Sequence, residues 1–374
     1  MKILVISPVY SLAGVPLAQF RLAKSLSDIG HNVDLIYGCK KNKFQEKSKN
    51  MNVIFFNKFR VIGMLFPLIK YLLLNKPKII FSAEDHLNAI VVIAKILSFS
   101  KAKLTVSSRV TPIDTYRNSH ILFSKGWFLK KLFPLVNSNA DVMTCVSRDM
   151  IKQYRKIFRY TKQVCVYNIV KNKDSTKKMK EKVKHPWIKN KNHQLIVASG
   201  KLAEWKGFDV LIRSIKILEE KKLNLKFKLL IIGGGPEEYN LNKLIVKFKL
   251  TKKIQILKPI TNTLKYFSKS DIFVLSSRVE GMPNVMIEAM MCGCTVVATD
   301  CPTGPREIIK QNQYGYLSKL NNPKDLAKNI HKALKKKVSS KKTNKIINNF
   351  SALEIIKKHF LLLKIEKDKW KFNL

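Results

Sequence analysis

The chain lacks long hydrophobic runs and paired cysteines. These absences argue against a membrane-spanning helix, a secretory signal and a zinc site. Its longest apolar run, residues 61–69, has nine residues, whereas a helix that spans a membrane needs about 20. The N-terminal apolar run, residues 3–6, is shorter than the apolar region of about 7–15 residues in a secretory signal. The six cysteines are scattered, and the nearest pair, Cys292 and Cys294, lacks zinc-site spacing. We therefore expect a cytoplasmic protein with reduced thiols.

Acidic residues are scarce in this chain. Its 374 residues include 71 lysines and arginines but only 25 aspartates and glutamates, which gives a net charge of +46. A surface of this kind attracts nucleic acid, anionic lipid and anionic small molecules. The excess of lysine also fits AT-rich coding, because isoleucine and asparagine are abundant too, so the charge alone does not choose among these partners. The length favours two domains.

Strand and helix patterns alternate along the chain in two series. The first series includes the strands "KILVIS" and "NVDLIYG", with a helical apolar pattern over residues 13–31 between them. The second series includes "QLIVASG", "KFKLLIIGGG", "DIFVLSS" and "GCTVVATD". This βαβ rhythm predicts two α/β units with parallel sheets, each doubly wound, and a cleft between them. Residues 171–193 separate the two series and are polar without a periodic apolar face, which indicates a linker.

The stretch "SSRVEGMPNVMIEAMMCG", residues 276–293, combines a loop with the start of a helix. Gly281 lets a ligand approach the backbone closely, and Pro283 suits the first turn of a helix. The free N–H groups of that first turn, around residues 282–286, would lie at the positive end of the helix dipole. The stretch therefore predicts an anion site that follows a strand.

Two carboxylates, Glu280 and Glu288, flank this predicted anion site. They would repel an anion, so they are better suited to accept hydrogen bonds from hydroxyl groups on the molecule that carries it. A nucleotide-sugar fits this arrangement, because one carboxylate would hold sugar hydroxyls and the other would hold ribose hydroxyls. The plainer alternative is a capping acid followed by an acid on the helix surface.

A second motif, "SGKLAEWKGFDVLI", covers residues 199–212. Lys201 and Lys206 lie on its predicted strand-to-helix loop, which ends at Gly207. Two cations on such a loop suit a diphosphate leaving group, because negative charge builds there as a glycosidic bond breaks. In a chain so rich in lysine, the alternative is a pair of solvated surface side chains.

Together, these motifs resemble retaining glycosyltransferases of family 4, which have the GT-B fold. The resemblance rests on "GKLAEWKGFDVLI", "LLIIGGGPEEYNL" and "SSRVEGMPNVMIEAMMCGCTVVATDCPTGPREII". The form of the motif in this chain, "EGMPN…TDCPTGPREI", is similar to the form found in the subgroup that builds bacterial surface glycans such as lipopolysaccharide core, O-antigen and capsule. The N-terminal "AGVPLAQFRLAKSLSDIGHNVDLI" also fits the family, so the resemblance extends over nearly the whole chain.

The resemblance implies a fold and a division of labour. The expected fold class is α/β: GT-B, with two Rossmann-like, doubly wound domains that face a central cleft. The expected parts are an acceptor-binding domain at 1–170, a linker at 171–192, a nucleotide-sugar-binding domain at 193–350, and a final helix at 351–374 that returns to the first domain.

Residue by residue, the resemblance implies a donor site. Lys201 and Lys206 match the cations on the donor diphosphate, although Lys201 stands where arginine is usual and so loses a bidentate contact. Glu288 matches the ribose-binding acid, Glu280 the acid at the donor sugar, and Gly14 the glycine whose backbone approaches the phosphates. The expected substrate-binding set is Gly14, Gly200, Lys201, Lys206, Glu280, Gly281, Met282, Pro283, Asn284 and Glu288.

The first domain departs from the family pattern at one position. Many relatives have a histidine on a loop that faces the donor sugar, whereas this chain has Arg109 after "AKLTVSS" and His86 after the preceding strand. The expected catalytic residues are therefore Glu280, Lys206, Arg109 and His86, and the identity of any base stays open. Retention does not require a strong base, because the leaving phosphate can take the acceptor's proton on the same face. For His86, the alternative is a histidine at a helix start.

Metal chemistry and cofactors are not expected. The chain contains no Asp-x-Asp, the pair through which other glycosyltransferases hold the diphosphate with a divalent cation. It also has no cluster of His and Cys ligands and no G-x-G-x-x-G after its first strand. Lysines and a helix terminus could hold the diphosphate instead, so the nucleotide-sugar is expected as substrate rather than as cofactor.

The expected partners follow from the resemblance and from the charge. The resemblance implies a UDP-sugar donor and a lipid-linked or growing glycan acceptor, with a soluble acceptor as the nearest alternative. Residues 57–76 and 116–137 mix basic with large apolar side chains, which favours docking on the anionic inner face of the cytoplasmic membrane. Ordinary core helices are the alternative for both stretches. A nucleic-acid-binding protein is the remaining rival, but no RRM, KH or helix-turn-helix signature supports specific nucleic-acid binding.

Overall fold

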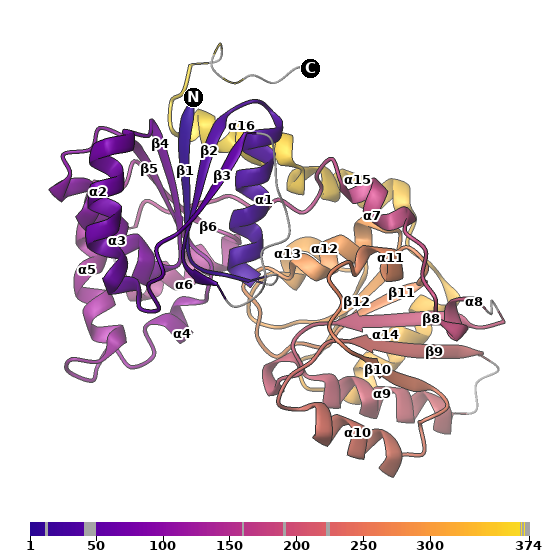
Figure 1. Ribbon diagram of the computed structural model, residues 1–374. Coiled ribbons are helices and arrows are strands. Elements are labelled where there is room, and N and C mark those ends of the chain that lie inside the picture. The colour runs from indigo at the N-terminus through magenta and orange to yellow at the C-terminus, as the bar shows by residue number, and fades with distance from the viewer. Residues whose placement is uncertain are drawn as a thin grey trace. The chain divides into compact units, whose positions relative to one another are not determined.

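The chain forms two compact units (Figure 1). The structure is a computed structural model that describes residues 1–11, 14–40, 50–158, 161–189, 192–221, 225–366, 368 and 370. Unit 1 comprises Met1–Asn172 and Phe350–Leu374, and unit 2 comprises Lys173–Asn349. Within the described ranges, no helix combines the length and the apolar character needed to cross a membrane.

Unit 1 is built on a parallel sheet with the strand order β3-β2-β1-β4-β5-β6-β7. The strands are β1 (Lys2–Tyr10), β2 (Asn32–Lys40), β3 (Met51–Phe55), β4 (Ile79–Ala83), β5 (Lys103–Ser108), β6 (Val142–Cys145) and β7 (Val164–Cys165). The order reverses between β1 and β4, which pair directly with each other. In doubly wound sheets, ligands bind at the carboxyl ends of the strands on either side of this reversal, the topological switch point.

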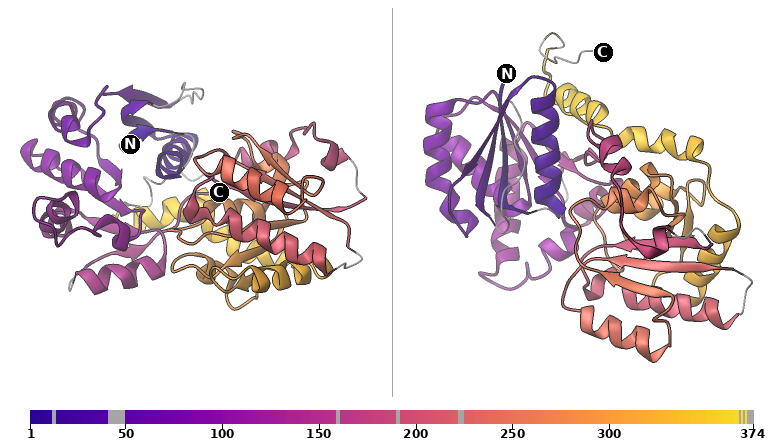
Figure 2. Two further views of the ribbon diagram at one scale, coloured as in Figure 1. Left: turned by 90° about the horizontal axis from the view of Figure 1, so that it is seen from below. Right: turned by 45° about the vertical axis from the view of Figure 1, so that its right-hand side comes forward.

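Helices cover both faces of this sheet, as Figure 2 shows from two further directions. The helices are α1 (Gly14–Asp28), α2 (Leu65–Asn75), α3 (Asp85–Leu97), α4 (Pro112–Thr115), α5 (Lys125–Asn139), α6 (Arg148–Ile157) and α16 (Ala352–Leu362), with the 3₁₀ turn η1 at Val61–Met64. Helices α1 and α16 contact each other on one face, and α2, α3 and α5 lie together on the other. The core between α1, α16 and the sheet includes Ile3, Phe20, Leu35, Phe81 and Phe360.

Unit 2 has a second parallel sheet, with the strand order β10-β9-β8-β11-β12-β13. The strands are β8 (Gln194–Ser199), β9 (Phe227–Ile232), β10 (Ile254–Leu257), β11 (Ile272–Leu275), β12 (Thr295–Thr299) and β13 (Tyr316–Ser318). Most of their side chains are buried, as continuous apolar runs predict for strands covered on both faces. The switch point of this sheet lies between β8 and β11, which pair directly.

The helices of unit 2 include two in the segment expected to be a linker. The helices are α7 (Ser175–Lys180), α8 (Pro186–Lys189), α9 (Phe208–Glu220), α10 (Glu238–Lys247), α11 (Leu264–Phe267), α12 (Asn284–Met291), α13 (Pro305–Ile309), α14 (Pro323–Lys335) and α15 (Ser340–Ile347), with the 3₁₀ turns η2 (Glu204–Lys206) and η3 (Asn348–Phe350). Helix α7 is held against α11, because Asn262 Nδ2 and Ser268 Oγ donate hydrogen bonds of 2.9 Å and 2.8 Å to its last carbonyl groups. Both helices are too short and polar to produce a periodic apolar pattern.

Candidate active site

The loops after β8 and β11 hold most of the residues that the sequence predicted for the donor. Because these strands are neighbours at the switch point, their loops leave the sheet side by side. Two hydrogen bonds to main-chain carbonyls join the loops: Ser276 Oγ donates to the Lys206 carbonyl at 2.9 Å, and Arg278 N donates to the Trp205 carbonyl at 2.7 Å. Gly207 permits this contact, since a Cβ there would lie 2.1 Å from Ser276 O and its φ is +61°.

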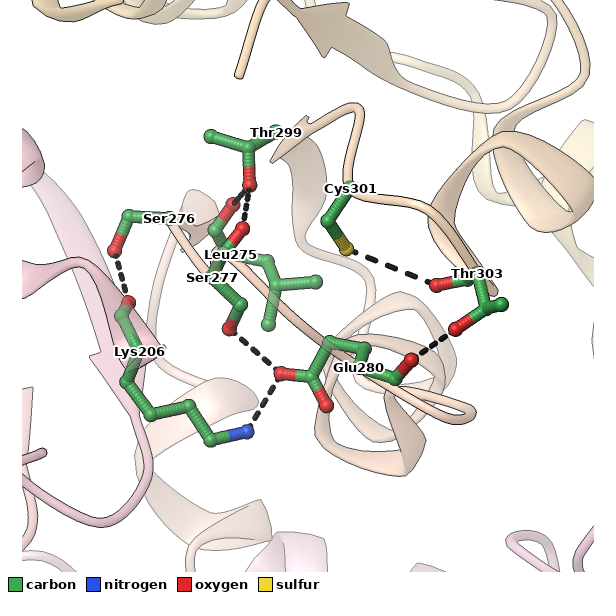
Figure 3. Close-up of polar contacts among 8 residues, drawn as sticks. All are labelled: Lys206, Leu275, Ser276, Ser277, Glu280, Thr299, Cys301 and Thr303. Atoms are coloured by element: carbon green, nitrogen blue, oxygen red, sulfur yellow. Dashed lines mark hydrogen bonds and ion pairs between the residues drawn. The ribbon is translucent and has the colours of Figure 1, made fainter. Parts of the chain in front are cut away.

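Lys206 and Glu280 meet between these two loops, as Figure 3 shows. Lys206 Nζ lies 2.6 Å from Glu280 Oε1, and the same oxygen accepts a hydrogen bond of 2.6 Å from Ser277 Oγ. The Lys206 and Glu280 side chains are only 19% and 9% exposed. Thr303 Oγ1 donates to the main-chain carbonyl of Glu280, and Thr299 Oγ1 donates to that of Ser277. The cluster Lys206–Glu280–Ser277 is therefore fixed from several sides.

This cluster leaves hydrogen-bonding capacity for a ligand. An ammonium group has three N–H donors, and within the described residues Lys206 uses one of them, on Glu280. Glu280 Oε2 accepts no hydrogen bond from any described residue, because both contacts to this carboxylate are made at Oε1. The arrangement can thus present N–H donors to an anion and a carboxylate oxygen to a hydroxyl group, side by side.

The start of α12 differs from the sequence prediction. Helix α12 begins at Asn284, so Pro283 is the N-cap residue rather than part of the first turn. The N–H groups of Asn284 and Met286 already donate to the carbonyls of Met282 and Pro283, each at 2.9 Å. Fewer N–H groups over residues 282–286 are therefore free than the sequence predicted, because the backbone makes a tight turn at Pro283 before the helix begins.

The remaining predicted donor residues of unit 2 lie on the same two loops or in α12. Glu288 is buried in α12, and Gly281 and Met282 lie in the loop that precedes this helix. Lys201 is exposed, and its Nζ lies 5.4 Å from the centre of the Trp205 ring. A Cβ at Gly200 would lie 3.6 Å from Lys206 Cε, so Gly200 faces the lysine stem.

In unit 1, Asp85 at the first position of α3 makes three side-chain hydrogen bonds. Its Oδ1 accepts from Ser108 Oγ at 2.7 Å, and its Oδ2 accepts from the hydroxyl groups of Tyr116 at 3.0 Å and Tyr154 at 2.5 Å. Burial raises the pKa of Asp85, and these hydrogen bonds oppose that rise. Asp85 therefore holds the end of β5 and helix α6 against α3.

His86 lies beside Glu84, a residue that the sequence analysis did not single out. His86 Nε2 is 3.5 Å from Glu84 Oε2. Burial lowers the pKa of His86 to about 4 and raises the pKa of Glu84 to about 7. The charge of Lys125 lowers the pKa of both groups. At neutral pH, His86 is therefore uncharged, whereas Glu84 can either hold or release a proton.

Arg109 and Gly14 complete the predicted residues of unit 1. Arg109 Nη2 donates to Gln19 Oε1 of α1 at 3.4 Å. Its Nε and Nη1 are buried and have no hydrogen-bond partner among the described residues, and burial lowers its pKa to about 10. The Arg109 guanidinium thus lies inside unit 1. Gly14 is the first residue of α1, with φ +60° and open space where a side chain would project.

Sequence analysis missed Glu84, Ser277 and Thr303. Glu84 directly follows β4, Ser277 lies two residues after β11, and Thr303 lies two residues before α13; this proximity to a strand end or a helix start was the signal available for them. Across the described ranges, no group of three or more His, Cys, Asp or Glu side chains is arranged to hold a metal ion.

Comparison with known sequences points to one family. Residues 179–352 match the family described as glycosyl transferases group 1. An uncharacterised glycosyltransferase of Methanocaldococcus jannaschii is 30% identical over 276 residues, which cover 71% of this chain and 65% of the relative, just under two thirds of its length. The N-acetylgalactosamine-N,N'-diacetylbacillosaminyl-diphospho-undecaprenol 4-alpha-N-acetylgalactosaminyltransferase of Campylobacter jejuni is 26% identical over 307 residues, or 82% of this chain and 76% of the relative.

Comparison with solved structures addresses the fold. HepE of Anabaena, solved in complex with UDP and glucose, matches with a TM-score of 0.70 at 18% sequence identity, over 97% of this chain and 99% of that chain. The two parallel-sheet, Rossmann-like units are those of GT-B glycosyltransferases, as the sequence predicted. Residues 179–352, which include both loops of the Lys206–Glu280–Ser277 cluster, are similar to glycosyl transferases group 1.

Proposed function

We propose that the chain is a retaining, metal-independent glycosyltransferase that moves a sugar from a UDP-sugar to a lipid-linked or growing glycan acceptor in bacterial surface polysaccharide biosynthesis. The observation that carries this proposal is the Lys206–Glu280–Ser277 cluster at the switch point of unit 2. Two names support the choice of substrates. The Campylobacter relative is named for a diphospho-undecaprenol acceptor, and HepE was solved with UDP.

The chemistry follows from the charges of the cluster. Lys206, with exposed Lys201 on the same loop, would stabilise the diphosphate as negative charge builds during cleavage of the glycosidic bond. Glu280 Oε2 would accept a hydrogen bond from a donor-sugar hydroxyl, and Glu288 would hold the ribose. The acceptor hydroxyl would attack from the face that the diphosphate leaves, and its proton would pass to the leaving phosphate.

The acceptor would be presented at the anionic inner face of the cytoplasmic membrane. The loop between α4 and α5 exposes Leu122 and Phe123, which are 62% and 70% exposed. Phe123 contacts the rings of Trp127 and Phe128. No acidic residue occurs from residue 115 to residue 140, a range that contains four lysines and arginines. Basic segments with exposed aromatic side chains bind anionic lipid surfaces.

A substrate screen tests this proposal. The protein would be incubated with a panel of nucleotide-sugars and with octyl glycosides of common hexoses and N-acetylhexosamines, and mass spectrometry would detect glycosylated products and released nucleotide. We expect UDP release and a product one sugar heavier than an octyl glycoside. Transfer only to free, unlipidated compounds would favour the soluble-acceptor alternative. A complete lack of hydrolysis and transfer with every nucleotide-sugar would contradict the proposed function.

A further inference from the structure

Glu84 has a backbone conformation that side chains rarely adopt. It lies at the N-cap position of α3 with φ +79° and ψ +126°. The positive φ is uncommon for a residue with a Cβ, and this ψ lies outside the small left-handed region that such residues tolerate best. Conformations of this kind persist only where the surrounding structure enforces them, and they cluster at functional sites.

Hydrogen bonds on both sides of the residue enforce this conformation. Glu84 N donates to the Ser107 carbonyl of β5 at 3.0 Å, and the Glu84 carbonyl accepts from Leu87 N and Asn88 N of α3 at 3.0 Å and 2.9 Å. Asn88 Nδ2 also donates to the Ser107 carbonyl at 3.1 Å. The main chain of Glu84 is thus fixed between the end of a strand and the first turn of a helix.

The charges of Lys125 and Arg109 act on the Glu84 side chain, but hydrogen bonds to it do not explain its strained backbone. The side chain does not cap α3, although it occupies the capping position. The Glu84 carboxylate accepts no hydrogen bond from any described residue. Its contact with His86 Nε2 is 3.5 Å long. The carboxylate is 20% exposed, so a ligand can reach it. A partly exposed carboxylate that is held by a strained backbone and receives no hydrogen bond from the described residues can accept one from a ligand.

The position of Glu84 in the sheet indicates where that donor comes from. Glu84 follows β4, which together with β1 forms the switch point of unit 1. The corresponding place in unit 2, the loops after β8 and β11, holds the Lys206–Glu280–Ser277 cluster. Glu84 therefore lies where the fold of unit 1 binds its own ligand.

We propose that Glu84 is an acceptor-binding residue of unit 1, whose carboxylate accepts a hydrogen bond from a hydroxyl group of the acceptor sugar. This inference rests on the proposed function, in which unit 1 binds the acceptor. The nearby groups agree with it: His86 is uncharged at neutral pH, Lys125 and Arg109 supply positive charge, and Asp85 is occupied by its own three partners. Burial also raises the pKa of Glu84 to about 7, so a hydroxyl donor would favour its ionised form.

Two substitutions of Glu84 separate acceptor binding from structure. Glu84→Gln keeps the size of the side chain but removes its charge, and Glu84→Gly removes the side chain and relieves the backbone strain. We expect both variants to lower transfer to the best octyl glycoside by a factor on the order of 10², with a raised KM for that glycoside. The Kd for UDP, measured by calorimetry, should stay at the wild-type value, because UDP binds unit 2.

A melting-temperature measurement tests the backbone strain at Glu84 and needs no acceptor. At a pH of about 4, where Glu84 is largely protonated in both the folded and the unfolded state, we expect Glu84→Gly to raise the Tm by about 2–4 °C, because glycine tolerates positive φ. Lys364→Gly is the matched control, since Lys364 is exposed, lies in unit 1 and has φ +53°. It should raise the Tm by a similar amount without changing transfer.

Either measurement can overturn the inference. Transfer by Glu84→Gln at the wild-type rate and KM would remove the acceptor role. A lower Tm for Glu84→Gly would show that the carboxylate is a structural element after all. Failure of the proposed function itself is distinguishable, because the wild type would then release no UDP from any UDP-sugar.

Discussion

At the scale of single residues, the contact between Lys206 and Glu280 decides how the candidate site can work. The sequence assigned these residues to two different parts of the donor, the diphosphate and the sugar. In the structure they form one ion pair of 2.6 Å. Removing either side chain would leave the other charge in a largely buried place without its partner, which is unfavourable.

The first prediction concerns this pair. Lys206→Ala should lower donor turnover by a factor on the order of 10²–10³, because one positioned cation at the leaving group is lost. Lys216→Ala is a matched control on the same unit, because Lys216 forms a more exposed ion pair with Glu220 on α9. Circular dichroism would verify the fold of both variants. Turnover near the wild-type level in Lys206→Ala would remove the diphosphate role.

The second prediction concerns pH and Glu84. Its pKa is raised to about 7 in the folded state, so the folded state binds the proton more tightly than the unfolded state does. The contribution of Glu84 to the free energy of unfolding therefore falls as the pH rises from about 4.5 to about 7. Glu84→Gln should be more stable than the wild type above that range, by up to about 3 kcal/mol, and the difference should shrink below it.

His86 shifts stability with pH in the opposite direction, so the comparison must isolate Glu84. The pKa of His86 is lowered to about 4, which makes the folded state more stable as the pH rises towards the ordinary histidine value. Measuring the Tm of the wild type and of Glu84→Gln across the same pH series cancels this term. A stability difference that does not change with pH would show that the Glu84 pKa is not raised.

At the scale of elements, the strands and their parallel sheets were predictable from the sequence, whereas the contacts between loops were not. Continuous apolar strands and glycine-terminated helices predicted two parallel sheets. The pairing of Lys206 with Glu280 joins residues 74 positions apart, and no local pattern encodes it. Glu84 was missed although it follows a strand, because the backbone conformation that distinguishes it is not displayed by the sequence. Helix α7 was missed because its stability comes from packing on α11 rather than from an apolar stripe.

The third prediction concerns the loop between α4 and α5 and the first turns of α5. The protein should float with anionic liposomes at low salt, since exposed Leu122 and Phe123 lie among basic residues. Changing Lys125, Lys130 and Lys131 together to glutamate should reduce flotation, because each basic residue near anionic lipid contributes about 1 kcal/mol. Changing Lys324, Lys328 and Lys335 of α14 in unit 2 is the matched control. Absence of wild-type flotation even at low salt would favour a soluble acceptor.

At the scale of the whole molecule, the two units repeat one plan. Each has a parallel sheet whose order reverses once, and each carries charged side chains where that reversal meets the carboxyl edge. The fold and the similarity to glycosyl transferases group 1 were predictable because they rest on long periodic patterns and on one specific motif. Donor sugar, acceptor and linkage depend on individual loop side chains, which no such pattern describes.

The fourth prediction concerns metal ions. The chain has no Asp-x-Asp, and Lys206 supplies a positive charge where the diphosphate is proposed to bind. Transfer should therefore continue in the presence of EDTA at the rate measured without it. A complete loss of transfer that magnesium restores would show that a divalent cation holds the diphosphate instead of lysine.

The central claim is retaining transfer from a UDP-sugar, and the most direct test is proton NMR of the reaction as it proceeds. The wild-type protein would be mixed with the UDP-sugar and the octyl glycoside selected by the screen, and the anomeric signals would be followed from the first turnover. The account predicts loss of the donor signal, appearance of UDP and a new glycoside with the anomeric configuration of the donor. A new glycoside with the opposite configuration, or a donor signal that never declines, would contradict it.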